Sequence, residues 1–284
     1  MTKSSPENEM QVSVLGQEWY ELAKGYDPFF LGESHSVSTP AFGDNLKDDL
    51  APLLSGGQVL NYTHFSIVMS KSRRLAYYTA VNIDGKQQKE IRRTKDNWYF
   101  DSRMERTYQA GPELYSKNDL DRGHLVRRRD PVWGEHAEKA NEDTFHFTNC
   151  APQHKELNQK TWLDLEDYIL HNAVTRQLKV TVFTGPVFKE SDPLYRGIKL
   201  PEEFWKIVVT VKQDGTLSAT AYLQTQKDFL GKLDFAYGEY KTYQVAVSHI
   251  ESLTGLDFGA IRNADPLTGS GSSYIIEAES DIRL

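Results

Sequence analysis

The chain has 284 residues and a formal net charge of −7, with 39% apolar, 26% charged and 12% aromatic residues. That length suffices for one large or two small domains with a real core, and the aromatic content excludes a mainly disordered chain. No run approaches the roughly 18 apolar residues of a membrane span, and the one cysteine, Cys150, excludes an intrachain disulfide.

The first fifteen residues, MTKSSPENEMQVSVL, are polar and favour a flexible arm. They lack the basic stretch followed by an apolar stretch that a secretory signal requires. With one cysteine and no membrane span, a cytoplasmic protein without membrane association is expected. Export by a signal-independent route would leave no trace in such a sequence.

Positive charge is concentrated in one part of this acidic chain. Residues 71–130 contain 15 lysines and arginines against 9 acidic residues, while the remainder contains 18 against 31. Three basic clusters lie there, at 71–74, 92–95 and 127–129. Any single cluster is usually a solvated face. Three within sixty residues are as compatible with a polyanion-binding surface as with solvation.

The predicted elements begin with a hairpin at 63–82 that ends at Asp84-Gly85. A strand-like segment around Arg122 and His124 follows. An aromatic strand at 144–148 then leads through a proline-containing loop into a helix at 157–171, with apolar residues at spacings of three and four. Later come a buried strand at 179–188 stopped by Gly185-Pro186, a hairpin at 204–225 around Gln213-Asp214-Gly215, and a helix at 241–254 stopped by Gly255.

These elements predict an α+β fold built on a mostly antiparallel central sheet flanked by helices. No repeat, low-complexity tract or interdomain linker divides the chain. We expect an N-terminal arm and extension at 1–50, one domain at 51–264, and a C-terminal tail at 265–284 that packs on the domain or extends from it.

The segment NDLDRGHLVRRRDP, Asn118–Pro131, carries the most chemical information. Strand alternation places Arg122 and His124 on one face, and Gly123 between them allows close approach to the backbone. The positive charge of Arg122 disfavours imidazolium, so His124 stays neutral and can accept a proton. Arg122 can hold phosphate oxygens with its planar guanidinium. The pair is therefore suited to phosphate chemistry.

A second group lies on the predicted helix at 157–171. Asn158 and Glu166 are eight residues apart, about 12 Å along a helix axis. Both cannot easily bind one ion directly, which suggests Asn158 as an oxygen ligand and Glu166 acting through a water. A site with few protein oxygens suits Mg²⁺. Zinc fits poorly, because no compact Cys/His set surrounds Cys150.

The DRGH motif at 121–124, followed by TNCAPQ at 148–153 and the LNQ..W..LE pattern at 157–166, resembles the DNA/RNA non-specific endonuclease family. That family includes sugar-nonspecific bacterial nucleases and mitochondrial endonuclease G and has a ββα-metal active site. The resemblance covers about residues 60–260, including IESLTGLDF at 250–258. Two motifs in order and at close spacing are specific, whereas either alone would be weak.

The resemblance implies roles for individual residues. His124 matches the general base that activates water, and Asn158 matches the single protein ligand of the Mg²⁺, which Mn²⁺ can replace. Arg122, Asn149 and Glu166 match residues that hold the scissile phosphate, the geometry of the site and the waters around the metal. Asn149 also has a structural interpretation, as an amide that caps a loop.

Further substrate contacts are expected from arginines. A phosphate-contacting arginine usually precedes a tryptophan-containing segment in this family, and Arg93 is the best match, with Arg92 as the alternative. Arg127, Arg128 and Arg129 depart from the family pattern after the histidine. They either grip the nucleic-acid backbone or stay solvated, and the sequence does not decide between these two interpretations.

The sequence thus predicts a Mg²⁺-dependent endonuclease that hydrolyses DNA and RNA, and the resemblance implies products with 5′-phosphate and 3′-hydroxyl ends. Two alternatives stay open: an inactive nucleic-acid-binding module on a nuclease scaffold, and a nuclease toxin or defence effector controlled by a partner. The sequence leaves open whether the chain forms a homodimer or binds an inhibitor or regulatory partner.

Overall fold

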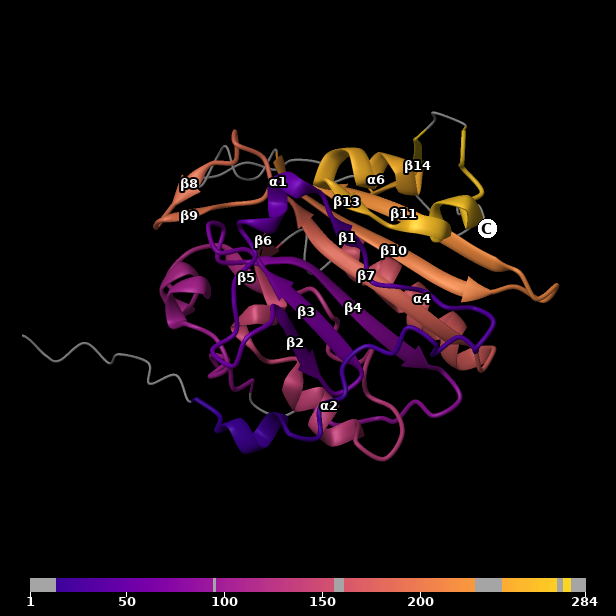
Figure 1. Cartoon of the computed structure of the whole chain (residues 1–284), viewed down its shortest axis with the longest axis horizontal. Coiled ribbons are helices and arrows are strands. Elements are labelled where there is room, and N and C mark those ends of the chain that lie inside the picture. The colour runs from indigo at the N-terminus through magenta and orange to yellow at the C-terminus, as the bar shows by residue number, and fades with distance from the viewer. Residues whose placement is uncertain (1–13, 94–95, 156–160, 228–241, 270–272, 277–284) are drawn as a thin grey trace, which may run out of the picture.

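The computed structural model describes residues 14–93, 96–155, 161–227, 242–269 and 273–276 (Figure 1). Its strands are β1 (Ala41–Phe42), β2 (Val59–Tyr62), β3 (Phe65–Met69), β4 (Ala76–Asp84), β5 (Leu120–His124), β6 (Cys150–His154), β7 (Lys179–Val187), β8 (Leu194–Tyr195), β9 (Ile198–Lys199), β10 (Glu203–Val211), β11 (Leu217–Thr225), β12 (Thr242–Val245), β13 (Leu256–Asp257) and β14 (Tyr274–Ile276).

The α-helices are α1 (Asp44–Lys47), α2 (Ala137–Asp143), α4 (Thr161–Thr175) and α6 (Val247–Thr254). Short 3₁₀ turns are η1 (Gln17–Tyr20), η2 (Arg106–Tyr108), η3 (Pro112–Leu114), η4 (Phe147–Asn149) and η5 (Gly259–Ala264). Within the described ranges, no helix is long and apolar enough to cross a bilayer.

The core of the fold is an eight-stranded sheet in the order β14-β12-β11-β10-β7-β4-β3-β2. Every neighbouring pair in it is antiparallel. The two predicted hairpins form its two halves as β3–β4 and β10–β11, and the pairing of β4 with β7 joins them. The predicted α+β class with a mostly antiparallel sheet is confirmed.

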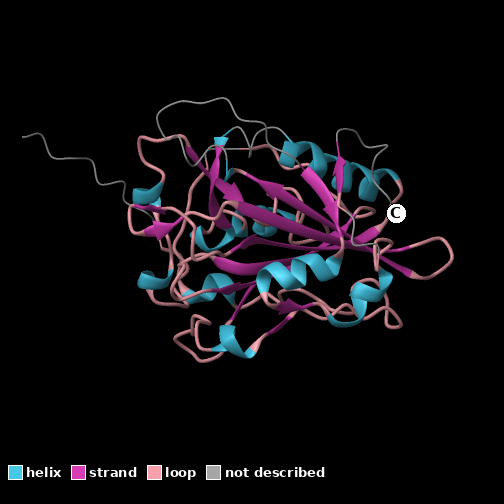
Figure 2. Cartoon of the chain, turned by 90° about the horizontal axis from the view of Figure 1, so that it is seen from above, coloured by secondary structure: helices cyan, strands magenta, loops and turns pink. Residues whose placement is uncertain are grey.

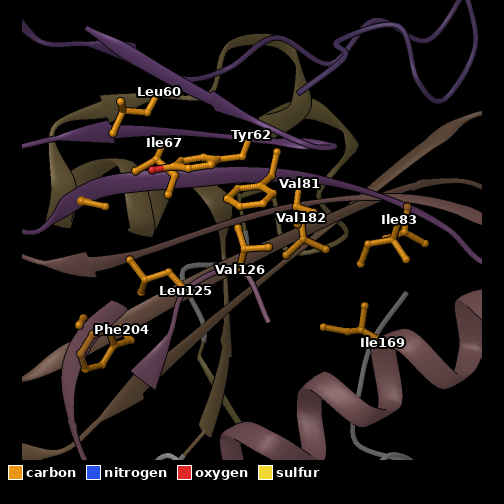
Figure 3. Close-up of a cluster of buried hydrophobic side chains, with 14 of the residues drawn as sticks. Leu60, Tyr62, Ile67, Val81, Ile83, Leu125, Val126, Ile169, Val182 and Phe204 are labelled. Carbon is orange, nitrogen blue, oxygen red and sulfur yellow. The ribbon is translucent and has the colours of Figure 1, made fainter. Parts of the chain in front are cut away.

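Both faces of this sheet are covered (Figure 2). On one face, Leu165, Ile169 and Ala173 of α4 pack against strand residues such as Val81 and Val182 (Figure 3). On the other face, α6 and η5 pack against residues such as Phe183 and Ile207. Because neither face meets water, β4 is buried along its whole length and shows no polar-apolar alternation.

A long excursion leaves the sheet after β4 and returns at β7. Its base is closed by a hydrogen bond from the Gly85 amide to the Leu178 carbonyl, 2.9 Å long. Within it lie β5, α2, β6 and α4, and β5 pairs only with β6 as a separate antiparallel ribbon among the described strands. The elements β5, β6 and α4 follow one another in the order expected of a ββα motif.

The segment before the sheet contributes to the core. Tyr20, Tyr26, Val37 and Leu50 are buried, and Tyr26 donates a hydrogen bond to the Val37 carbonyl. Most of the predicted arm at 1–15 lies outside the described residues. At the other end, β14 pairs with β12 at the edge of the sheet.

Strand β7 continues through Gly185-Pro186 to Val187, so the predicted stop there is wrong. Thr184 is the last residue of β7 that pairs with β4, and beyond it β7 has β10 as its neighbour. A proline is tolerated at such an edge position. A Cβ on Gly185 would lie 2.4 Å from the Tyr77 carbonyl oxygen and 2.8 Å from Trp205, so only glycine fits this close approach.

The predicted helix at 241–254 is wrong in its first part, because residues 242–245 form β12 and only Val247–Thr254 form α6. Thr242, Gln244 and Val245 are all buried between β11 and β14, an arrangement that a helical spacing of Tyr243 and Val247 does not reveal. Gly255 ends the helix as predicted, with φ of 71° in the left-handed region.

The predicted aromatic strand at 144–148 is also wrong. Only His146 makes a strand-like bridge there, to Tyr99, and the chain then turns through η4. A strand follows η4 at Cys150–His154, in the segment predicted to be a proline-containing loop. Helix α4 ends at Thr175 instead of His171, and the predicted start at Leu157 lies outside the described residues.

Candidate active site

Arg122 and His124 point to the same side of the β5–β6 ribbon. His124 is paired with Cys150 and Arg122 with Pro152, so they occupy alternate positions along β5. Both contact one ring: the Trp98 indole centroid lies 4.9 Å from that of His124 and 5.3 Å from the Arg122 guanidinium carbon. The predicted common face is therefore present in the structure.

The His124 imidazole lies between aromatic rings. Besides Trp98, the ring of Phe145 meets it edge-on, with centroids 5.2 Å apart. Trp98 and Phe145 also pack against each other, and Phe147 completes this aromatic cluster. Phe145 and Phe147, predicted to lie in a strand, thus belong to the aromatic cluster against which His124 packs.

His124 has an unusual protonation environment. Its Nε2 is buried and has no hydrogen-bond partner among the described residues. Burial lowers the pKa of His124 to about 3, Asp96 opposes this effect, and Arg93, Arg128 and Arg122 add to it. An imidazole held neutral with a bare ring nitrogen can accept a proton. Cys150 is no competitor, because burial raises its pKa to about 12.

The arginines around His124 are held in different ways. Arg93 makes a bidentate ion pair with Asp96, with distances of 3.0 and 2.6 Å. Arg128 donates to Asn141 at 2.8 Å, and Arg129 lies 3.8 Å from the exposed Glu90. Arg93, Arg122 and Arg128 therefore gather at the histidine, whereas Arg129 lies at the surface.

Asn149 holds the chain directly after His124. Its side-chain oxygen accepts from the Val126 amide, and its Nδ2 donates to the Val126 and Thr144 carbonyls, all at 2.9 Å. Its own carbonyl accepts from the Leu125 amide. Asn149 is fully buried, and Leu125 and Val126 enter the core beside it (Figure 3). Its described contacts therefore hold the backbone that follows His124, as expected of an amide that caps a loop.

Glu166 lies on α4 between two cations. Its Oε1 accepts from Lys206 Nζ at 3.3 Å, and its Oε2 lies 3.7 Å from Arg127 Nε. Arg127 also donates to Asp167. Burial raises the pKa of Glu166, while Lys206 and Arg127 act against that rise. Burial raises the pKa of the neighbouring Asp130 to about 7.

Asn158, the predicted metal ligand, lies outside the described residues. Within the described ranges, no group of three His, Cys, Asp or Glu side chains could hold a metal ion. Glu166 is a carboxylate of the donor chemistry that Mg²⁺ and its waters prefer, and an amide oxygen such as that of Asn158 belongs to the same class. The residue types of the expected set therefore fit this ion.

Three residues of the site were not predicted from the sequence. Trp98 lies in the tryptophan-containing segment that follows Arg93, but no pattern there predicts its contact with His124, and Asp96 lies in a polar segment without a distinctive signal. Lys206 carried a visible signal, because it is a lone charge within the apolar run FWKIVV at 204–209. A charge in the middle of a buried strand calls for a partner, but the sequence does not identify that partner as Glu166.

The profile of the family described as DNA/RNA non-specific endonuclease matches residues 50–264. The chain belongs to this family. It is 36% identical to uncharacterized protein y4fB of Sinorhizobium fredii over 93% of its own length and 43% of that protein. It is 31% identical to a protein named Nuclease from Nostoc sp., over 58% of its own length and 60% of that protein. The chain therefore spans about half the length of these curated relatives.

The fold is also that of a solved structure. A chain in the crystal structure of the EndoG/EndoGI complex, described as showing the mechanism of EndoG inhibition, superposes with a TM-score of 0.56. It is 20% identical and the match covers 71% of this chain and 85% of that one. Membership of the family and this fold agree with the resemblance found in the DRGH and TNCAPQ motifs.

Proposed function

We propose that this chain is a metal-dependent endonuclease that hydrolyses phosphodiester bonds of DNA and RNA to 5′-phosphate and 3′-hydroxyl ends. Its membership of the DNA/RNA non-specific endonuclease family supports the reaction class. The observation that carries the proposal is the position of His124, whose buried Nε2 has no partner among the described residues and whose ring shares the Trp98 contact with Arg122. A base next to phosphate-binding cations is what hydrolysis of a phosphodiester needs.

His124 takes the proton of the attacking water on its ring nitrogen as the water approaches phosphorus. Arg122 binds phosphate oxygens and offsets the charge that builds on them, while Trp98 orients both side chains. Asn149 keeps the backbone after His124 in register, so the imidazole does not need to reorganise during the reaction.

Asn158 and Glu166 would hold the metal, Asn158 as an oxygen ligand and Glu166 through water. When bound, Mg²⁺ or Mn²⁺ would offset negative charge on the reacting phosphate and on the leaving 3′-oxygen. Contacts to the nucleic acid would be made mainly with phosphates, so sequence preference should be weak and salt sensitivity high.

A plasmid-nicking assay with purified chain, with and without EDTA, tests this function, with a transcribed RNA as a second substrate. We expect both to be cut in the presence of Mg²⁺, and the ends to carry 5′-phosphate. Cleavage of one defined sequence only would contradict the proposed substrate range. Binding of DNA without cleavage in any divalent metal would favour the inactive binding module.

We also propose that a partner restrains such an activity in the cell. The support is limited to the structural neighbour EndoG, which was solved with EndoGI in a complex described as inhibition. Co-purification of the chain from its host, with and without a wash at high salt, would test for a bound inhibitor. A fully active chain with no associated protein would contradict this proposal.

A further inference from the structure

Lys206 is a buried charged residue near the candidate site, and the stability of the fold alone does not account for it. It lies on β10, the side chain is 1% exposed, and it points to the same face of the sheet as Phe204, toward α4. A buried lysine is rare and costly unless it is paired. Replacing a buried ion pair by apolar side chains is often neutral or stabilising, so burial alone does not require a charge here.

Lys206 contacts the Glu166 carboxylate, and its charge also opposes the raised pKa of a second buried acid, Asp130. Its Nζ donates to Glu166 Oε1 at 3.3 Å and to Thr184 Oγ1 at 3.1 Å. Arg127 approaches the other oxygen of Glu166 from the chain that follows β5. Each carboxylate oxygen of Glu166 therefore faces one cation, and the two cations come from different elements of the fold.

The contacts of Glu166 with Lys206 and Arg127 link the sheet to the excursion that carries the site. Lys206 belongs to β10 at the centre of the sheet, whereas Arg127 comes three residues after His124. Glu166 lies on α4 between them. Residues that orient a metal-proximal carboxylate commonly change metal affinity or activity by about 10–100-fold when they are removed.

We propose that Lys206 is a positioning residue for Glu166: it holds the carboxylate from the sheet side, so that Glu166 faces the metal site through its water. This inference rests on the proposed function. In this assignment Lys206 contacts neither substrate nor metal and acts on the metal site through Glu166, while its charge also acts on the buried Asp130.

The test compares Lys206→Met, Glu166→Gln and the double variant with the wild-type chain. Met has nearly the length of Lys without its charge, and the double variant removes both charges of the Lys206–Glu166 pair, so Glu166 is not left as an unpaired buried carboxylate. Two properties are measured: Mn²⁺ binding by calorimetry without nucleic acid, and kcat and KM for plasmid cleavage. Thermal unfolding of each variant reports its fold.

Lys206→Met should weaken Mn²⁺ binding and lower kcat by about tenfold, no more than Glu166→Gln does, with KM for DNA changed little. In the Glu166→Gln background the same substitution should add almost nothing to either defect. Lys189→Met is the matched control, because Lys189 pairs with Glu203 at 2.5 Å in another Lys–Glu pair away from Glu166. It should leave Mn²⁺ affinity and kcat unchanged.

An equal defect from Lys206→Met in both backgrounds, or unchanged Mn²⁺ affinity, would overturn the inference. If Lys206→Met does not fold, the double variant decides: it should match Glu166→Gln in Mn²⁺ binding, and a further loss would count against us. A wild-type chain that binds Mn²⁺ and cuts nothing would end the proposed function, while the calorimetry would still decide the role of Lys206. A wild-type chain that does not bind Mn²⁺ would overturn the positioning role of Lys206.

Discussion

The two halves of the candidate site differ in the hydrogen bonding of their polar groups. On the β5–β6 ribbon, His124 lies against Trp98 and Phe145 with its Nε2 unpartnered. On α4, Glu166 is held by Lys206 and Arg127. A group that must gain and lose a proton needs a bare nitrogen, whereas a carboxylate that must stay in place needs partners. The difference in hydrogen bonding matches the two proposed roles, a proton acceptor at His124 and an oriented carboxylate at Glu166.

The largest expected effect lies on the ribbon half. His124→Ala should lower cleavage by about 10²–10⁴-fold, because it removes the general base. Its binding to DNA should persist, and added Mg²⁺ or Mn²⁺ should not restore turnover. Single-turnover cleavage over a metal titration, with DNA binding measured in parallel, checks this. Metal rescue of His124→Ala would show that base and metal-binding roles were assigned to the wrong residues.

The helix half should respond to metal concentration. Asn158→Ala should lower activity at low Mg²⁺ by about 10–100-fold, and excess Mg²⁺ or Mn²⁺ should recover part of it. Glu166→Gln should be a milder version of the same defect, since it changes the contacts of water around the ion. The half-saturating metal concentration of each variant is the measurement. A defect in either variant that is independent of metal would argue against this division of roles.

The bare imidazole should also be visible in stability. The folded pKa of His124 is lowered from 6.5 to about 3, so the unfolded chain binds a proton that the folded chain refuses. The stability that neutral His124 permits is complete above pH 6.5 and is lost as the pH falls toward 3. His124→Leu should therefore lose stability less steeply in this window, by up to about 1.4 kcal/mol per pH unit.

Urea unfolding of the wild-type chain and of His124→Leu at a series of pH values measures that slope. Identical slopes for the two proteins would mean that the imidazole titrates normally in the fold. The proposed contrast between an unpartnered His124 and a partnered Glu166 would then fail for His124.

The smallest effect separates three neighbouring arginines. Replacing Arg127, Arg128 and Arg129 together should weaken DNA binding more at low salt than at high salt. Arg128→Ala or Arg129→Ala alone should reduce the slope of log binding constant against log salt by about 1 at most. Arg127→Ala should leave the slope almost unchanged, because its guanidinium is bound to Glu166 and Asp167.

Fluorescence anisotropy at several salt concentrations gives these slopes. If Arg127→Ala lowers the slope as much as Arg128→Ala, Arg127 contacts phosphate in solution. Glu166 would then be held by Lys206 without Arg127. An unchanged slope for the triple variant would make all three arginines bystanders in binding.

Sequence reasoning predicted the parts of the fold that depend on local patterns. The two hairpins follow from tight turns and alternating or continuous apolar runs, and Gly255 ends α6 as its left-handed φ requires. Sequence reasoning failed where the secondary structure of a segment depends on strands that are distant in the sequence. Residues 242–245 are a strand because β11 and β14 lie on either side, and Pro186 is tolerated because β4 no longer pairs there.

The same division holds for the site. The common face of Arg122 and His124 is a property of one strand and was predictable from alternation. The pairing of Glu166 with Lys206 joins residues forty positions apart in sequence. A sequence pattern could show that Lys206 is out of place in an apolar strand, but only the packing of α4 on the sheet identifies its partner.

The closed base of the excursion between β4 and β7 has a consequence for biosynthesis. The N-terminal hairpin β3–β4 is complete long before β7 leaves the ribosome, and until then β4 presents an unpaired edge. The excursion itself can change in length at low cost, since each doubling of a closed loop costs only about 0.6 kcal/mol. Insertions in exposed turns of the excursion, outside β5, β6 and α4, should therefore be tolerated by the equilibrium fold and yet prolong the exposure of that edge during synthesis.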